Sequence, residues 1–101
     1  MEPMKARSSR SREVAETLAI AALAFIAEDP ERLGGFLAAT GLPIERIRQA
    51  AREPDFLAGV LEHMLADESL LIAFAEAAAI DPAEIARAQA TLGGRWESDL
   101  P

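Results

Sequence analysis

Cysteine and tyrosine are absent from this 101-residue chain, and histidine and tryptophan occur once each. The lack of cysteine excludes disulfides, thiolate metal sites and a cysteine nucleophile, and it fits a reducing cytoplasm. Because the chain has a single histidine, no serine or threonine is paired with an evident base for nucleophilic catalysis. We therefore expect a protein that is not an enzyme and carries no cofactor.

Long hydrophobic stretches are also scarce. The apolar run Leu18–Ala27 is too short to span a bilayer as a helix, which needs about 20 residues. A basic head precedes this run, as in a signal peptide, but Glu13 and Glu16 lie between the head and the run, where a signal tolerates acids poorly. We therefore expect a soluble cytoplasmic protein that does not bind membranes.

Acidic residues dominate the chain, whose net charge is −7. The charge is uneven, because residues 1–12 carry +3 and the remainder carries −10. An acidic body repels phosphate backbones, which argues against general nucleic-acid affinity. We expect a flexible basic segment at 1–12, a single domain at 13–93 and a flexible tail at 94–101.

The composition favours helices throughout. Half of the residues are hydrophobic, most of them alanine or leucine, and no stretch alternates as a half-buried strand does. Capping residues, prolines and glycines divide the chain into six helices with breaks of two to four residues. The predicted starts are Ser11, Asp29-Pro30, Pro43, Pro54, Asp67 and Asp81-Pro82. The predicted ends include Thr40 before Gly41, then Ile80, and Gly93-Gly94.

Two predicted helices lack a polar face. Leu18–Ala27 has no charge, and Glu76 is the one charged residue between Leu70 and Ile80. Helices that are apolar all round are buried on several sides or lie in an oligomer interface, so we expect the others to pack around these two. The predicted inward stripe of the first helix is Val14, Leu18, Ala21, Ala22 and Phe25.

The chain around Asp29 resembles the chain around Asp67. Aligned without a gap, residues 18–51 and 56–89 share Leu23/Leu61, Asp29/Asp67, Leu33/Leu71, Phe36/Phe74, Ala39/Ala77, Ile47/Ile85 and Ala50/Ala88. This register predicts two copies of one helical unit. The fold that we expect is all-α, a compact orthogonal bundle of about six short helices built as two related three-helix halves.

Two glycines, Gly34 and Gly35, lie inside the predicted second helix, where together they cost roughly 1–2 kcal/mol relative to alanine. They either admit a ligand or a partner backbone, or they permit close contact with another helix of the same chain. The second unit has Ile72-Ala73 at the matching place. Both interpretations make this helix a candidate for a contact surface.

The single histidine, His63, lies on the edge of the apolar stripe of the fourth helix, one turn before Asp67. Helical spacing supplies no further ligand, so we expect a half-buried histidine near a carboxylate and no metal site. Trp96 follows the double glycine and either contacts a partner or docks on its own domain.

The segment from Phe36 to Arg52 has features of a helix-turn-helix. Gly41 and Leu42 fall at the turn, and Ile47 falls in the core of the recognition helix. The small residue usual on the first helix is replaced by Leu37. A recognition helix would present Arg46, Arg48, Gln49 and Arg52 to phosphates and base edges. A DNA-binding regulator gains support if these arginines are exposed and loses it if Glu45, Glu53 or Asp55 pairs with them.

Three stretches resemble a family of small bacterial proteins, the domain-of-unknown-function family 3572. They are LAFIAEDPERLGGFLAATGL at 23–42, REPDFLAGVL at 52–61 and LADESLLIAFAEAAAIDPAEI at 65–85. The family has no assigned activity, so the resemblance implies no catalytic or binding residue. Its genes often lie near one for a response regulator, which implies a signalling component as partner.

These patterns together favour a non-enzymatic protein-interaction or regulatory adaptor module, with self-association as its nearest variant. The candidate partner-binding residues are Gly34, Gly35, His63 and Trp96. The alternative is a small helix-turn-helix-like DNA-binding regulator.

Overall fold

Six helices follow one another in the computed structural model, which describes the backbone of residues 3–93 and the side chains of residues 11–93. No strand occurs in this range, so the all-α class is confirmed. Breaks of two or three residues separate successive helices. The helices are α1 (Pro3–Ala27), α2 (Pro30–Thr40), the 3-10 turn η1 (Ile44–Arg46) continued by α3 (Ile47–Ala50), α4 (Pro54–Leu65), α5 (Glu68–Ala78) and α6 (Pro82–Gly93).

Aspartate side chains cap the starts of α2, α5 and α6, as the sequence predicts. Each carboxylate accepts a hydrogen bond from a backbone N–H group of the first turn, which the helix itself leaves without a partner. The negative charge also lies at the favourable end of the helix dipole. The bonds run to Asp29 Oδ1 from Glu31 N (2.9 Å), to Asp67 Oδ1 from Leu70 N (3.2 Å) and to Asp81 Oδ1 from Ala83 N (2.9 Å).

The ends of α2 and α5 both have a residue in the left-handed conformation. Gly41 closes α2 with φ 72°, as predicted. Ala79 closes α5 with φ 59°, and the N–H of Ile80 donates to the carbonyl oxygen of Ala75 at 2.9 Å. This bond is that of a Schellman motif. The prediction that the fifth helix runs through Ile80 is wrong, because an alanine adopts the conformation that a glycine usually signals.

Helix α1 begins earlier than expected. It starts at Pro3, so Ser11 lies inside the helix and the predicted N-cap at Ser11 is wrong. A proline is tolerated in a first helical turn because the N–H groups there have no partner within the helix. The expected domain boundary at residue 13 therefore does not coincide with a helix start. In the described part of the chain, no helix is long and apolar enough to cross a bilayer.

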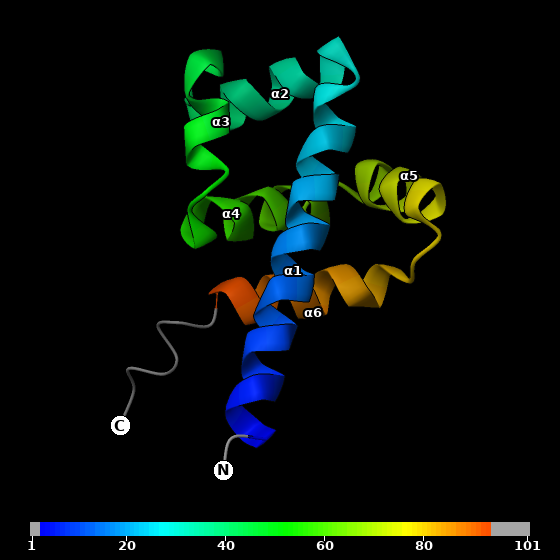
Figure 1. Ribbon diagram of the computed structural model, residues 1–101. Coiled ribbons are helices and arrows are strands. Elements are labelled where there is room, and N and C mark those ends of the chain that lie inside the picture. The colour runs from blue at the N-terminus through cyan, green and yellow to red at the C-terminus, as the bar shows by residue number, and fades with distance from the viewer. Residues whose placement is uncertain (1–2, 94–101) are drawn as a thin grey trace.

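The centre of the fold is formed by α1, α4 and α6. In Figure 1, α4 and α6 run in opposite directions and α1 crosses both. Ala15, Ala19 and Ala22 of α1 are fully or almost fully buried, and their small side chains let the crossing helices approach closely. The largest fully buried side chains are Ile26, Phe36, Val60, Leu61, Met64 and Ile85.

The inward face of α1 is rotated from the predicted stripe. Ala22 is buried and Leu18 and Phe25 are half-buried, but Val14 and Ala21 are exposed. Helical spacing alone does not distinguish these faces, because alanine lies on both sides of the helix.

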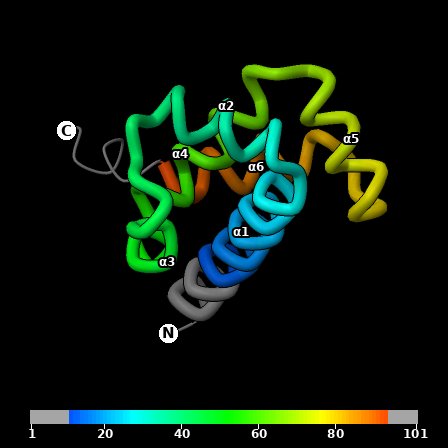
Figure 2. Tube along the Cα trace, turned by 90° about the horizontal axis from the view of Figure 1, so that it is seen from above, coloured from blue at the N-terminus to red at the C-terminus, as the bar shows by residue number. Residues whose placement is uncertain are grey.

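Helix α5 lies at the edge of the fold, which corrects the expectation that the other helices surround it (Figure 2). It packs on α4 and α6, while its Ile72 is 45% exposed. Its link to α1 is the contact of Phe25 with Phe74, whose ring centroids are 5.4 Å apart. The apolar composition of α5 therefore did not predict its position at the edge of the fold.

Candidate functional site

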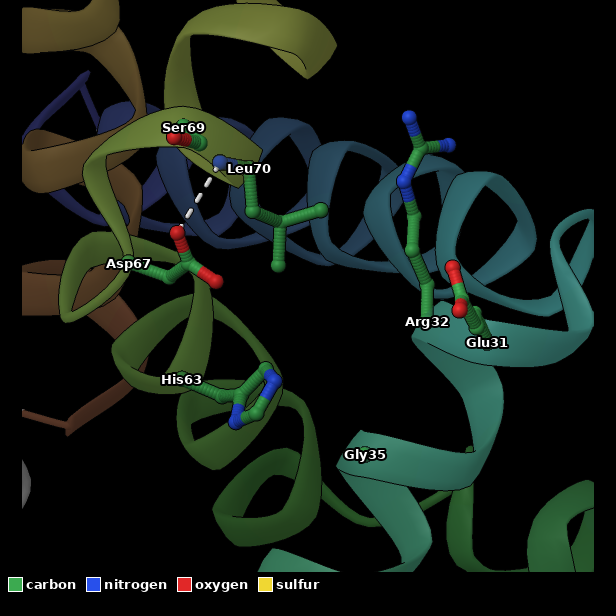
Figure 3. A pocket seen from close by; sticks show the side chains of 7 residues that line it. All are labelled: Glu31, Arg32, Gly35, His63, Asp67, Ser69 and Leu70. Carbon is green, nitrogen blue, oxygen red and sulfur yellow. Dashed lines mark hydrogen bonds between the residues drawn. The ribbon is translucent and has the colours of Figure 1, made fainter.

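A pocket of about 310 Å³ opens where α2 faces α4 and the start of α5. Figure 3 shows His63 of α4 and Asp67 on one side of the pocket and Glu31 and Arg32 of α2 on the other. The pocket brings Gly35 and His63 together, two residues that the sequence singled out separately. Its lining is Glu31, Arg32, Gly35, His63, Asp67, Ser69 and Leu70.

The glycines of α2 do not serve close packing against any other helix in the part of the chain that the structure describes. Gly34 and Gly35 are both exposed, and a Cβ atom added at either one would meet no atom within 4 Å outside its own helix backbone and chain neighbours. The interpretation that these glycines permit contact with another helix of the same chain is therefore wrong. Two positions of weak helix propensity instead lie on an open surface, one of them in the wall of the pocket.

Arg32 lines the pocket, and two neighbouring side chains engage its cation. Its guanidinium carbon lies 4.3 Å above the centroid of the Phe25 ring, and its Nε lies 3.8 Å from Oδ2 of Asp29. Both contacts turn the cation toward the α1–α2 corner. The exposed carboxylates of Glu31 and Asp67 also line the pocket, so its lining has two acidic side chains beside this partly engaged cation.

The imidazole of His63 is half-buried. Its ring lies edge-on to Phe36, with centroids 5.2 Å apart, and it shares the pocket with Asp67. The predicted half-buried histidine near a carboxylate is thus confirmed. Among the described residues, no three His, Cys, Asp or Glu side chains converge as metal ligands.

Ser69, His63 and Asp67 are the residue types of a hydrolytic triad, and all three line the pocket. Their arrangement is not that of a triad. No hydrogen bond joins any two of these side chains, and Oδ1 of Asp67 instead accepts the N–H of Leu70 at 3.2 Å. Asp67 therefore has a structural contact that accounts for its position.

The predicted DNA-binding segment has the expected turn but lacks the expected helix. Gly41 is left-handed, yet the chain after Pro43 forms a 3-10 turn followed by a four-residue helix. This is too short to lie along a major groove as a recognition helix does. Arg46, Arg48, Gln49 and Arg52 are all exposed, and no ion pair within residues 11–93 involves these three arginines.

Some residues of the pocket were not evident from the sequence. Leu70 looked like an ordinary core residue, and Glu31 and Ser69 looked like ordinary first-turn residues of capped helices. The sequence feature that could have predicted these residues is the N-cap Asp67. It follows His63 by one helical turn, so the first turn of α5 begins beside the imidazole. Trp96 lies outside the described residues.

Comparison with known proteins identifies a family but no activity. The family model described as "Protein of unknown function (DUF3572)" matches residues 12–95, which include the whole pocket. No curated protein matches the chain. No solved structure matches it either.

Proposed function

Since the chain belongs to this family, whose description assigns no activity, we propose from the structure that it is a non-enzymatic protein-interaction module. It acts as a regulatory adaptor in the cytoplasm, and its partner, a signalling component, binds at the pocket between α2, α4 and α5. The single observation that carries the proposal is the open glycine pair of α2 beside this pocket.

The glycine pair supports a partner for a physical reason. Each glycine weakens the helix by about 1 kcal/mol relative to alanine, and no packing contact with another described residue requires its small size. At the matching places in α5 the chain has Ile72 and Ala73. Because glycine has no side chain, a partner can approach the backbone of α2 more closely than it can approach the backbone of α5.

The charges at the pocket indicate the chemistry of the partner. Glu31 and Asp67 present carboxylates at the rim, while the cation of Arg32 is engaged by Phe25 and Asp29. Leu70 supplies an apolar wall and is almost completely buried. A partner segment with a lysine or arginine next to an apolar residue complements this surface.

The absence of hydrogen bonds among Ser69, His63 and Asp67 supports a binding role over a catalytic one. A hydrolytic site needs a base within hydrogen-bonding distance of its nucleophile and a third group that orients the base. The exposed positions of Ser69 and Asp67 also leave water free to enter, whereas catalytic electrostatics gain strength where water is excluded.

We also infer that the chain contains two related three-helix halves. The correspondence of α2 and α5 supports this: each follows an aspartate cap and ends at a left-handed residue, Gly41 or Ala79, at matching places of the alignment. Phe36 and Phe74 are both buried. The third elements differ, because α3 has four residues and no buried side chain, whereas α6 has twelve residues and packs in the core.

DNA binding remains the second candidate, and one observation favours it. Arg46, Arg48 and Arg52 are exposed and make no ion pair with a described residue, so their charges are available to phosphates. The shortness of α3 and the acidic body count against it.

Affinity capture from the native cytoplasm tests the proposal with a matched pair of variants. Gly35→Gln places a side chain at the pocket, and Ala86→Gln adds the same side chain on an exposed position of α6. Glutamine favours helix more than glycine does, so loss of binding by the first variant does not come from unfolding.

We expect one protein to be retained by the wild type and by Ala86→Gln and lost with Gly35→Gln. Equal retention by all three proteins contradicts the pocket as the binding site. Recovery of nucleic acid that disappears with Arg46→Ala and Arg48→Ala supports the second candidate instead.

A further inference from the structure

A groove of about 400 Å³ lies between α1 and α6, which cross one another (Figure 1). Apolar side chains from both helices line it. Ala15 and Ala88 are almost completely buried, Leu18 is half-buried and Val14 is 61% exposed. The lining is completed by Ser11, Glu84, Arg87 and Thr91. None of these residues lines the pocket between α2, α4 and α5, so the occupant of the groove does not depend on the proposed function.

We propose that the indole ring of Trp96 docks in this groove, after the chain turns back over the end of α6. Thr91 lies in the lining of the groove and two residues before Gly93, where α6 ends. Trp96 follows Gly93 by three residues. Three extended residues reach up to about 10 Å, while the helix advances only about 3 Å from Thr91 to Gly93. Gly94 begins the connection, and glycine adopts the conformations that a tight reversal needs.

The aromatic residues of the described chain are already packed. The chain has four phenylalanines, no tyrosine and one tryptophan, and all four phenylalanines are buried or packed against the core. Burial of a large aromatic side chain removes about 150–250 Å² from water, and this drives the docking. Val14 gains from the same contact, because the ring covers its exposed methyl groups. The tail at 94–101, which the sequence predicts to be flexible, is then fixed at Trp96.

The polar residues of the groove suit an indole ring. Among residues 11–93, no ion pair involves Arg87, so its guanidinium is available to stack on an aromatic face. A buried indole N–H group needs an acceptor, and the groove offers the carboxylate of Glu84 and the hydroxyl oxygens of Ser11 and Thr91. The Thr91 hydroxyl donates to the carbonyl oxygen of Arg87 at 3.0 Å, which leaves its own oxygen able to accept.

Charge complementarity gives the direction of the chain beyond the docked ring. Residues 97–101 carry two acidic residues and no basic one. Helix α1 begins at Pro3 and extends past its crossing with α6 (Figure 1). Counting back from Val14 by one and two helical turns gives Arg10 and Arg7, so both positions lie on the Val14 side of the helix. Opposite charges therefore favour a tail that runs along α1 toward its start.

The fluorescence of the intact protein tests the docking directly. Because the chain has no tyrosine and a single tryptophan, Trp96 is the source of the emission. We expect the wild type to emit at shorter wavelength than the urea-unfolded protein and to be quenched less by acrylamide. An emission maximum and a quenching equal to those of the unfolded protein overturn the proposal.

A charge placed in the groove is expected to release the ring. Val14→Asp puts a carboxylate beside the docked indole, and Ile72→Asp is the matched control, since Ile72 is also exposed but lies on α5. We expect Val14→Asp to move the emission and the quenching toward those of the unfolded protein, and Ile72→Asp to leave both unchanged. Circular dichroism verifies that both variants are folded. An emission that neither variant changes, or that both change equally, shows that the ring does not lie in the groove.

Arg87→Gln tests the contact of the guanidinium with the ring. Loss of a cation–π contact at an exposed site weakens docking by a factor of about two to five, so we expect a corresponding rise in the undocked population that acrylamide quenches. Arg48→Gln, at an exposed arginine of α3, is the control. Equal quenching of the two variants contradicts the proposed position of the ring.

Thermal unfolding tests whether Val14 and Trp96 touch. Val14→Ala and Trp96→Ala are made singly and together, because residues in contact give effects that do not add, whereas distant residues give effects that do. We expect Val14→Ala to lower the unfolding midpoint less in the Trp96→Ala background than in the wild type. Ile72→Ala combined with Trp96→Ala is expected to be additive. Additivity in both pairs overturns the proposal.

Dilution distinguishes docking within one chain from docking on a second copy. The emission is recorded over a range of protein concentrations, with the molar mass from light scattering beside it. We expect an emission that does not depend on concentration. A shift toward the emission of the unfolded protein on dilution would show that the tail docks on a second copy, and it overturns docking within the chain.

Discussion

The ring of Phe36 meets the imidazole of His63 edge to face, with centroids 5.2 Å apart and planes at 83°. Phe36 also meets the ring of Phe56 in the same manner, at 5.9 Å and 76°. Phe36 belongs to α2 and the other two rings belong to α4, so this aromatic cluster holds α2 over α4. His63 therefore takes part both in the lining of the pocket and in the aromatic contact between α2 and α4.

Truncation of the Phe36 ring is expected to destabilise the protein strongly. The side chain is completely buried, and Phe→Ala at such a site costs about 3–5 kcal/mol through lost burial and an unfilled cavity. Urea unfolding followed by circular dichroism measures the loss. Leu92→Val, also in the core, serves as a control with a smaller expected loss. A loss below about 1 kcal/mol for Phe36→Ala would contradict the role of this ring as the anchor of α2.

Alanine at the two glycines of α2 is expected to stabilise the protein. Gly34→Ala and Gly35→Ala should each raise the free energy of unfolding by about 1 kcal/mol, because alanine favours helix and its methyl group meets open space. Thermal unfolding of the single and double variants measures the gain. Destabilisation by either change would show that the backbone of α2 is in contact with another part of the chain.

The left-handed alanine at the end of α5 predicts the opposite kind of substitution. Ala79 has φ 59°, a conformation that glycine adopts without the Cβ penalty. We expect Ala79→Gly to stabilise the protein by about 1 kcal/mol, while Ala78→Gly, one residue earlier in the helix, destabilises it by a similar amount. Chemical denaturation distinguishes the two. Equal loss of stability in both variants would contradict a left-handed conformation at Ala79.

Removal of the cap at the start of α5 tests the structural role of Asp67. Its Oδ1 accepts the N–H of Leu70 at 3.2 Å, and loss of an N-cap costs about 1 kcal/mol. We expect Asp67→Ala to show this loss and Asp67→Asn to keep most of the stability, because an amide oxygen accepts the same bond. Equal loss in the two variants, measured by urea unfolding, would assign the effect to charge and not to capping.

Local signals in the sequence predicted much of the fold. These signals are the aspartate caps, the prolines that follow two of them, and Gly41, and each acts within a single helical turn. They therefore predicted the starts of the helices from α2 onward and the end of α2. The start of α1 was not, because Ser11 is tolerated inside a helix as well as at a cap. The end of α5 was missed because Ala79 takes a conformation in which glycine is the usual signal.

The candidate site was predictable only in parts. Gly35 and His63 were singled out for separate reasons, but their meeting depends on how α2 folds over α4, which is fixed by the burial of Phe36. The helical spacing of apolar residues also did not predict which face of α1 is buried, because alanines lie on both its buried and its exposed sides. Tertiary packing determines both the meeting of Gly35 with His63 and the buried face of α1.

Photo-crosslinking from the wall of the pocket tests the central claim most directly. In the cysteine-free chain, Gly35→Cys and Ala86→Cys each accept one thiol-reactive photo-crosslinker, and the labelled proteins are irradiated in native cytoplasm and identified by mass spectrometry. We expect one discrete protein partner to be captured from position 35 and not from position 86. Capture of the same proteins from both positions, or of none from position 35, would contradict a partner-binding site between α2, α4 and α5.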